Sequence, residues 1–430
     1  MTKKRRRTRY FDRLRLRHVR CFKETDVPLD PQVTVVIGGN GSGKTTLVEA
    51  AAALTGGSDE PPTDFPLRRK TSNAEIALFD KGGQQPAAVW KLKGGTATLK
   101  RLPEERFLFA YGRYRRVFYP EDSEESPSDP SSDLDELVSR VGQRRTVTLY
   151  RPDNHLLRDM ARYLAALHRG AESDPNLGVI FKRLNDSLAV LGQGISGIKM
   201  LKRDYGYVPR VIRSGFALEM RELSDGYQAL LVIIFDLLLR YAYLFPFLVN
   251  PLEGEATVLI DEVDLHLHPR WQRTVITQLT ELFPMTQFIL TTHSPAVVQG
   301  AIDLGMKVVV LAEKGGAADA RALRPGLMRD LRGAEIGAVL LEDELFGVES
   351  RYSPEYGKIE QRVTDMRSKI QAGTLTEEDE KEVFEDLNTL KMLVAKDEER
   401  RADGSFMSQL AGLRISLLKE LAAELRAQRS

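Results

Sequence analysis

A phosphate-binding loop is the clearest chemical feature of the sequence. Residues 38–45 read Gly-Gly-Asn-Gly-Ser-Gly-Lys-Thr, which fits the pattern G-x-x-x-x-G-K-[ST]. In such a loop the backbone N–H groups surround a nucleotide's phosphates, the lysine reaches the β- and γ-phosphates, and the hydroxyl binds Mg²⁺. The pattern therefore predicts a site for ATP and Mg²⁺, with Lys44 on the phosphates and Thr45 on the metal.

The flanking residues decide between a phosphate site and a chance glycine-rich turn. Val33–Ile37 is apolar and β-branched and predicts a buried strand, and residues 46–54 predict a helix. A loop between strand and helix receives the partial positive charge of the helix N-terminus, which favours phosphate. We predict nucleotide contacts from Gly38, Gly39, Asn40, Gly41, Ser42, Gly43, Lys44, Thr45 and Thr46.

A pair of acids follows a second apolar run. Thr257–Ile260 predicts a buried strand, and Asp261 and Glu262 come directly after it. In phosphate-loop ATPases an acid at this place supports Mg²⁺, and a neighbouring group positions or deprotonates the attacking water. Asp261 is the predicted Mg²⁺ ligand beside Thr45, and Glu262 the predicted catalytic base. The alternative interpretation is that the pair is simply two surface carboxylates at the end of a strand.

Two polar segments elsewhere are candidates for the same site, and the first has the chemistry of an anion site. Ser224, Asp225 and Gly226 precede a long apolar run, so a hydroxyl, a backbone N–H and a helix N-terminus come together there. His293 stands in Thr-Thr-His-Ser-Pro after another predicted strand, between Gln287 and Thr291. A lone histidine here would favour a structural role, but the segment resembles the switch-histidine motif of ABC-type ATPases. That resemblance implies that His293 is catalytic, together with Lys44 and Glu262, and contacts the γ-phosphate or the water.

The residues after Glu262 need a separate interpretation. Asp264 lies in the same loop, and the resemblance to ABC-type ATPases, in which this loop crosses to the partner subunit, implies that Asp264 is a further nucleotide-site residue. His266 and His268 form a His-x-His pair that could ligate a metal, but no carboxylate–His spacing supports it. A structural turn into a helix near Trp271 is the favoured interpretation.

The composition sets limits on the setting. The chain has 430 residues and a net charge of +1, which gives no overall attraction to nucleic acid or membrane. Its one cysteine, Cys21, excludes an intramolecular disulfide framework and favours the cytoplasm. The apolar stretch 229–249 contains Asp236 and Arg240, so a buried core helix is favoured over a membrane span.

The basic N-terminus has two interpretations. Residues 3–9 contain Lys and Arg almost without interruption, and Arg13, Arg15, Arg17 and Arg20 follow. Such a cluster can contact phosphates, and DNA is a possible partner. A solvated tail and the exposed face of one strand explain the same residues equally well.

Strands that alternate with helices predict an α/β fold, with a mainly parallel sheet covered on both faces. We predict a first ATPase lobe over 1–150, which includes an acidic, Ser- and Pro-rich loop at 120–135. A mainly helical insertion is predicted at 151–215 and a second ATPase lobe at 216–350. Residues 351–430 read as amphipathic helices, either a cap on the ATPase core or a docking and assembly segment.

The order of phosphate loop, Ser224 motif, Asp261-Glu262 and His293 resembles ABC-type ATPases. Within them it resembles the SMC/RecF/OLD branch, and most of all the stand-alone AAA/ABC ATPases of prokaryotic anti-phage defence, such as the PtuA subunit of Septu. Asp225 and Tyr227 depart from the family's signature loop. No glutamine follows Phe107–Tyr111, where the family's Q-loop would be; the sequence there is Gly-Arg-Tyr-Arg-Arg.

The resemblance implies an ABC-type ATPase head that forms a homodimer, or a higher homo-oligomer, around two ATP molecules. The phosphate loop of one chain would face the signature loop of the other, and hydrolysis would control a separate effector protein, expected to be a nuclease. A RecF-like DNA-binding repair ATPase is the first alternative. A scaffold in which ATP turnover is incidental is the second.

Overall fold

The structure is a computed structural model. It describes residues 9–55, 71–103, 105–114, 175–192, 194–203 and 206–334, with further positions at 146–147, 149, 161, 164–165, 167–169, 339 and 345–346. The acidic segment 120–135, the basic residues 3–7 and the predicted C-terminal helices lie outside the described residues. The chain divides into two compact units, residues 1–346 and 347–430, and all of the described residues belong to the first.

One half of a large mixed sheet is parallel. Its strands run in the order β14-β3-β13-β12-β7-β8. All five neighbouring pairs are parallel, so their carboxyl ends meet at one edge. The bounds are β3 Val33–Gly38, β7 Phe107–Tyr111, β8 Thr146–Val147, β12 Ala256–Ile260, β13 Thr286–Thr291 and β14 Lys307–Lys314.

The other half continues the same sheet in the order β6-β5-β4-β1-β2-β15 and is mostly antiparallel. A hairpin between β14 and β15 joins the two halves. The sheet is therefore α/β and parallel around the phosphate loop, as predicted, with an antiparallel extension. The bounds are β1 Phe11–Val19, β2 Phe22–Pro28, β4 Asn73–Asp80, β5 Pro86–Lys93, β6 Thr96–Lys100 and β15 Ala317–Ala322.

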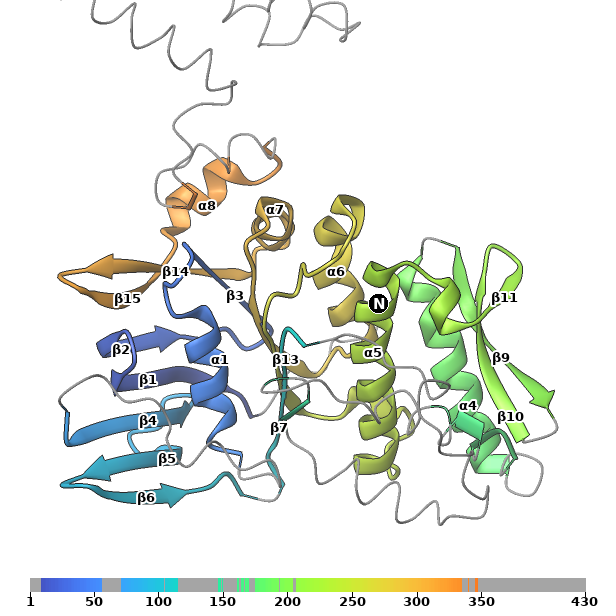
Figure 1. Ribbon diagram of the computed structural model, residues 1–430, viewed down its shortest axis with the longest axis horizontal. Helices are drawn as coiled ribbons and strands as arrows, with labels where there is room; N and C mark the ends of the chain where they lie inside the picture. Colours follow the sequence, from blue (N-terminus) through green and yellow to red (C-terminus); the bar gives the residue numbers. More distant parts are fainter. Residues whose placement is uncertain are drawn as a thin grey trace, which may run out of the picture. The chain divides into compact units, whose positions relative to one another are not determined.

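Two hydrophobic cores lie on opposite faces of this sheet, because successive side chains of a strand point to opposite sides. On β3, Val35 and Ile37 belong to one core and Val36 belongs to the other. Figure 1 shows α1 on one side of β13 and β7, and α5 and α6 on the other. The helices are α1 Lys44–Ala52, α5 Asp225–Leu244, α6 Pro269–Leu282, α7 Pro295–Asp303 and α8 Pro325–Leu331.

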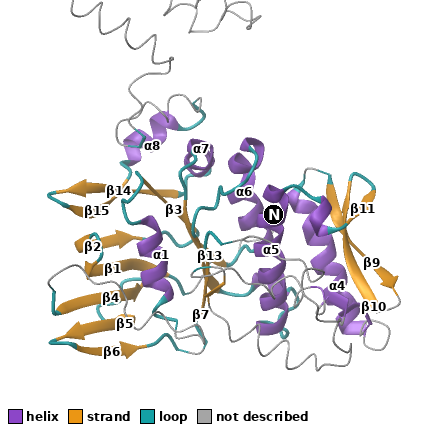
Figure 2. Cartoon of the chain, viewed as in Figure 1, coloured by secondary structure: helices purple, strands orange, loops and turns teal. Residues whose placement is uncertain are grey.

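A small antiparallel sheet stands beside these helices, apart from the large sheet (Figure 2). It contains β9 Ile195–Arg203, β10 Gly206–Arg213 and β11 Phe216–Leu218, and helix α4 Pro175–Ser187 precedes it. This sheet crosses the boundary predicted between residues 215 and 216. The described part of the predicted helical insertion therefore contains strands as well as a helix.

Helix α5 is long and apolar enough to cross a membrane by composition, but 83% of its apolar window is buried inside the protein. Two of its charged side chains are buried as a pair: Arg240 Nε donates to Asp236 Oδ2 at 2.6 Å, and each side chain is only 1% exposed. The Tyr111 hydroxyl of β7 donates to the same carboxylate oxygen at 2.6 Å. Helix α5 is therefore tied to the strand beside β12 by a buried polar cluster.

Candidate functional site

The phosphate loop is shaped by close packing against the β1–β2 turn. Gly43 has φ of 103° and precedes helix α1 as its N-cap residue. A Cβ at Gly43 would lie 2.6 Å from Cys21 Sγ and 2.8 Å from the Phe22 ring, so only glycine fits there. Ser42 Oγ is buried without a hydrogen-bond partner among the described residues. A free buried hydroxyl and a helix N-terminus in one loop fit a bound phosphate.

Lys44 lies over the loop that it belongs to. Its Nζ donates to the carbonyl oxygens of Gly38 at 2.7 Å and Gly39 at 3.0 Å, and the residue is 6% exposed. Burial lowers the pKa of Lys44, while the carboxylates of Asp261, Glu262 and Asp264 oppose that shift. The lysine that is predicted to bind phosphate and the predicted acids therefore lie close enough together to influence one another's charge.

Thr45 and Asp261 meet across 216 positions of sequence. The Thr45 hydroxyl donates to Asp261 Oδ2 at 2.8 Å, and the Thr291 hydroxyl donates to Asp261 Oδ1 at 2.6 Å. Asp261 is 1% exposed, and its backbone N–H donates to the carbonyl of Tyr111. The pair supplies a hydroxyl and a carboxylate oxygen, the kind of ligand that Mg²⁺ prefers. Sequence reasoning did not identify Thr291 as a holder of this carboxylate.

Glu262 has an unusual backbone conformation at the strand end. Its φ is +49°, which is rare for a residue with a side chain, and its N–H donates to Thr291 Oγ1 at 2.8 Å. The next residue, Val263, donates its N–H to the Thr291 carbonyl. Thr291 therefore holds both Asp261 and the turn at Glu262. Strained backbone of this kind is often found where a side chain must be aimed at a substrate.

Asp264 and His293 come from adjoining loops. The Thr292 hydroxyl donates to Asp264 Oδ1 at 2.5 Å, and the backbone N–H of Ser294 donates to Thr292 Oγ1 at 2.9 Å. His293 lies between Thr292 and Ser294 in the chain, and its side chain is exposed. Its ring has no hydrogen-bond partner among the described residues, so it is available for a ligand at this edge.

The Ser224 motif forms the start of helix α5. Ser224 is the N-cap residue, yet its exposed side chain makes no capping hydrogen bond. Asp225 is also exposed, in the first turn. A Cβ on Gly226 would overlap the carbonyl oxygen of His266. The glycine therefore allows the loop after Glu262 to pack directly on the helix start.

The departure at Tyr227 has a structural reason. Its ring packs edge-on against Trp271 of α6 with centroids 4.4 Å apart, and the Arg213 guanidinium lies 4.4 Å from the Tyr227 centroid. The tyrosine joins α5, α6 and the small sheet, which explains an aromatic residue at this position.

We expect Gly226→Ala to destabilise the protein by about 1–3 kcal/mol, because its methyl group meets backbone that cannot move aside cheaply. Urea unfolding of the variant measures this loss. Gly326→Ala is the matched control, since a Cβ there meets nothing within 4 Å. Equal unfolding midpoints for both variants would contradict the close packing.

The His-x-His pair takes part in a turn. His268 is the N-cap residue of α6, and its Nδ1 accepts from the Arg270 N–H at 3.3 Å. His266 has φ of +61° in the preceding turn. Among the described residues, no group of three His, Cys, Asp or Glu side chains could hold a metal ion.

The arginines of β1 form ion pairs along their strand. Arg15 Nε lies 2.8 Å from Asp26, Arg13 contacts the same carboxylate, and Arg17 lies 2.7 Å from Glu24. Arg20 follows β1 and lies 2.6 Å from Glu49 of α1. These carboxylates offset the positive charge of the face, which favours the exposed-strand interpretation over a phosphate-binding cluster.

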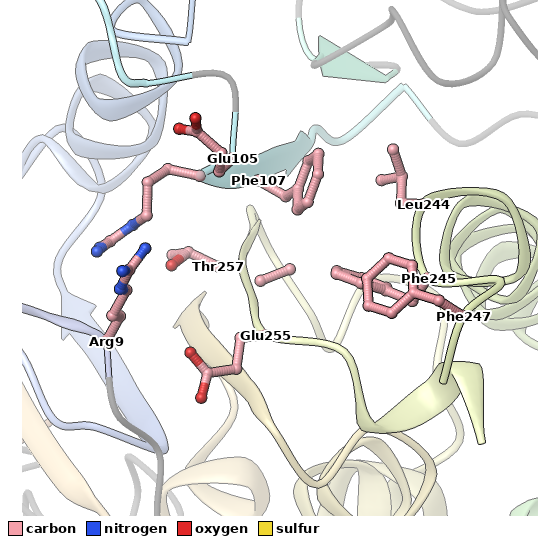
Figure 3. A pocket seen from close by; sticks show the side chains of 10 residues that line it. Arg9, Glu105, Phe107, Leu244, Phe245, Phe247, Glu255 and Thr257 are labelled. Atoms are coloured by element: carbon pink, nitrogen blue, oxygen red, sulfur yellow. The ribbon is translucent and has the colours of Figure 1, made fainter. Parts of the chain in front are cut away.

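A cavity of about 600 Å³ lies at the other end of β7 and β12 (Figure 3). Phe107 and Ala256, the first residues of those strands, line it. Aromatic side chains of Phe245 and Phe247 stand on one side and Arg9 on the other. It shares no residue with the predicted nucleotide site.

The fold and the site together define a phosphate-loop nucleotide-binding unit of the ABC type. The loop follows β3 and opens α1, the two acids follow β12, and His293 follows β13. These strands are neighbours with parallel register, so the three motifs meet at one sheet edge. The Ser224 motif starts a helix on the face opposite α1.

The family AAA_21, described as "AAA domain, putative AbiEii toxin, Type IV TA system", matches residues 33–299. That span is more than half of the chain, and the chain belongs to this family.

Three curated relatives show where similar chains occur. The chain is 43% identical over 99 residues to "Retron Vc95 probable ATPase" of Vibrio cholerae serotype O1 biovar El Tor, covering 23% of this chain and 19% of the relative. It is 27% identical over 218 residues to "Septu protein PtuA" of Bacillus thuringiensis, 50% and 51% of the two chains. It is 35% identical over 149 residues to "DNA replication and repair protein RecF" of Arthrobacter sp. (strain FB24), 32% and 37%.

The chain spans about half or less of the length of these relatives. Among solved structures, the Smc head domain of Pyrococcus furiosus bound to the C-terminal domain of ScpA is similar, with a TM-score of 0.47 and 13% identity over 75% of this chain and 98% of that one. The predicted resemblance to ATPases of the SMC/RecF branch found in defence systems is confirmed.

Proposed function

We propose that the protein is an ATPase that works as a switch: it binds ATP with Mg²⁺, dimerises around two nucleotides and controls a partner effector in anti-phage defence. The hydrogen-bonded set of Thr45, Asp261 and Thr291 carries this proposal, because it joins the phosphate loop to the acids in one site. The similarity to Septu PtuA and to a retron ATPase supports the setting in defence.

The side chains of five predicted residues have separate roles in this nucleotide site. Lys44 and the loop N–H groups bind the β- and γ-phosphates, and Thr45 and Asp261 hold Mg²⁺, which supplies positive charge that stabilises the transferring phosphoryl group. Glu262 takes a proton from the attacking water. His293, exposed next to this edge, contacts the γ-phosphate.

The exposed hydroxyl of Ser224 supports a site completed by a second chain. Ser224 is not used to cap its own helix, and its helix start offers N–H groups to an anion. In the dimer these groups bind the γ-phosphate held by the partner's loop. Hydrolysis removes those contacts, so the dimer relaxes and the effector receives the signal.

A mixing experiment tests this arrangement. Lys44→Ala inactivates one element of the site and Ser224→Arg the other, so each variant alone is expected to be inactive. A mixed dimer retains one of its two composite sites, so an equimolar mixture should recover about a quarter of parental turnover if the chains pair at random, and up to about half if only mixed dimers form. No recovery, with mixed dimers demonstrated by mass, would contradict completion in trans.

The effector, expected to be a nuclease, and a cytoplasmic location belong to the same proposal. Copurification of the full chain from cells, with and without a trapped nucleotide, identifies the effector directly. The similarity to RecF supports the second candidate, a DNA-repair ATPase. Direct phosphate contacts would make DNA affinity fall steeply with salt, whereas the paired arginines of β1 predict little such binding.

A further inference from the structure

Arg113 occupies a place at the nucleotide edge that the functions above leave unused. Strand β7 is parallel to β12 with Tyr111 opposite Ile260, and Asp261 donates its N–H to the Tyr111 carbonyl at 2.8 Å. The chain leaves β7 through Gly112 and Arg113 just as it leaves β12 through Asp261 and Glu262. Neighbouring strands lie about 4.8 Å apart, so a long arginine side chain reaches from one strand end to the other.

The surroundings of Arg113 are acidic. Its pKa is raised, first by the hydrogen bond with Tyr114 and further by the carboxylates of Glu262 and Asp261. The same guanidinium counteracts part of the upward shift in the pKa of Glu49, which arises mainly from burial. Arg113 is thus in the electrostatic field of the acids on both sides of the phosphate loop.

The contacts of Arg113 with other described residues are weak. Its Nη2 lies 3.4 Å from the Tyr114 hydroxyl, its guanidinium carbon lies 5.3 Å from the Tyr114 ring, and the side chain is exposed. By contrast, Lys44 is buried on its own loop, and Arg20 lies 2.6 Å from Glu49. Arg113 therefore has donors available for an incoming anion, and its planar fork matches phosphate oxygens.

We propose that Arg113 is a further catalytic residue of this site, whose guanidinium donates to the γ-phosphate of the ATP bound by the same chain. The proposal rests on the ATPase function proposed above. As water attacks, its oxygen bonds to the γ-phosphorus, Glu262 takes the proton, and the bond to the β–γ bridging oxygen breaks. Negative charge then shifts toward the ADP oxygen, and Arg113 stabilises it without giving up a proton.

The rate of ATP hydrolysis by the Arg113→Ala variant measures the contribution of the guanidinium to catalysis. A guanidinium on the transferring phosphate is worth about 10³–10⁵ in kcat, and we expect a loss within or near this range. Added guanidinium ion should restore part of the rate, which a purely structural role would not show. Arg17→Ala is the matched control, because Arg17 is an exposed arginine paired with Glu24 away from the loop. Unchanged kcat in Arg113→Ala would overturn the proposal.

Binding measurements test the contact without turnover. In Arg113→Ala we expect affinity for ATPγS to fall about tenfold or more while affinity for ADP stays the same, because only the former carries the γ-phosphate. Equal affinities of parent and variant for ATPγS would overturn the proposal. If the parent itself does not hydrolyse ATP, the proposed function fails, and this affinity ratio still decides the role of Arg113.

Mixed dimers show which chain the arginine serves. When Arg113→Ala is added to the Lys44→Ala chain and mixed with Ser224→Arg, the intact site keeps its own arginine and turnover should recover. When it is added to the Ser224→Arg chain instead, recovery should be lost. The opposite result would place Arg113 on the partner's nucleotide and overturn the assignment to its own chain.

Discussion

Replacement of Glu262 by glutamine is expected to lower ATP turnover by about 10²–10⁴-fold while ATP binding persists. The amide has the shape of the carboxylate but cannot accept a proton from water. The Thr291 hydroxyl contacts the backbone of residue 262, so the turn itself should survive the substitution. Steady-state hydrolysis and equilibrium binding of ATP with Mg²⁺ measure the two quantities separately.

The same variant should accumulate dimers with ATP, since the γ-phosphate that joins the chains is no longer removed. Mass measurement in ATP and in ADP shows this difference. Lys44→Ala is the control, because it should stay monomeric in both nucleotides. Parental turnover in Glu262→Gln would move the catalytic role elsewhere, and His293 is then the first residue to test.

Removal of the buried carboxylate in α5 is expected to lower the free energy of unfolding by about 3–5 kcal/mol, because the Arg240 guanidinium then loses its ion pair with Asp236 in a fully buried place. Asp236→Leu makes this change and also deprives the Tyr111 hydroxyl of its acceptor. Burial raises the pKa of Tyr111 well above its usual value, and the Asp236 carboxylate raises it further, so the phenol remains a donor. Urea unfolding measures the loss.

Two controls separate the charge from the packing. Asp236→Leu combined with Arg240→Met replaces the pair by apolar side chains and should regain most of the lost stability. Tyr111→Phe removes one hydrogen bond and should cost only about 0.5–1.5 kcal/mol. If the single Asp236→Leu variant were as stable as the parent, the buried pair would have no structural importance.

The phosphate loop was predictable because its signal is local. Val33–Ile37, the glycine-rich octet and the following helix are contiguous, so chain geometry alone sets the relation of Lys44 and Thr45. The meeting of Asp261 with Thr45 depends on distant segments. It was predictable because the carboxyl ends of neighbouring parallel strands lie at one edge.

Other contacts between side chains far apart in sequence were not predictable. Thr291 and Thr292 were noted only as part of the motif around His293, and their hydrogen bonds to Asp261 and Asp264 depend on the register of β12 and β13. Asp236 and Arg240 have the i, i+4 spacing of a helix ion pair, which is a usable signal. Tyr111, the third member of this buried polar cluster, comes from strand β7, and nothing in the sequence indicated its contact with the helix.

Strand β15 was missed for a different reason. Its residues, Ala317–Ala322, are rich in alanine and have low strand preference, so the partner strand β14 decides their conformation. A signal existed in Gly315 and Gly316, whose φ values of 59° and 72° suit a two-residue hairpin turn. Gly-Gly after a buried strand could have predicted the hairpin.

The position of β3 has a consequence for synthesis of the chain. This strand leads into the phosphate loop, and its two neighbours are β13 and β14, which come from residues 286–291 and 307–314. At about 5–20 residues per second, a ribosome needs about 13 to 54 seconds to travel from residue 38 to residue 307. Until β13 has been made, roughly the first 12 to 50 seconds at these rates, β3 has neither neighbour, and until β14 has been made it lacks one, so a nascent chain would expose the edges of this apolar strand to chaperones or to other nascent chains.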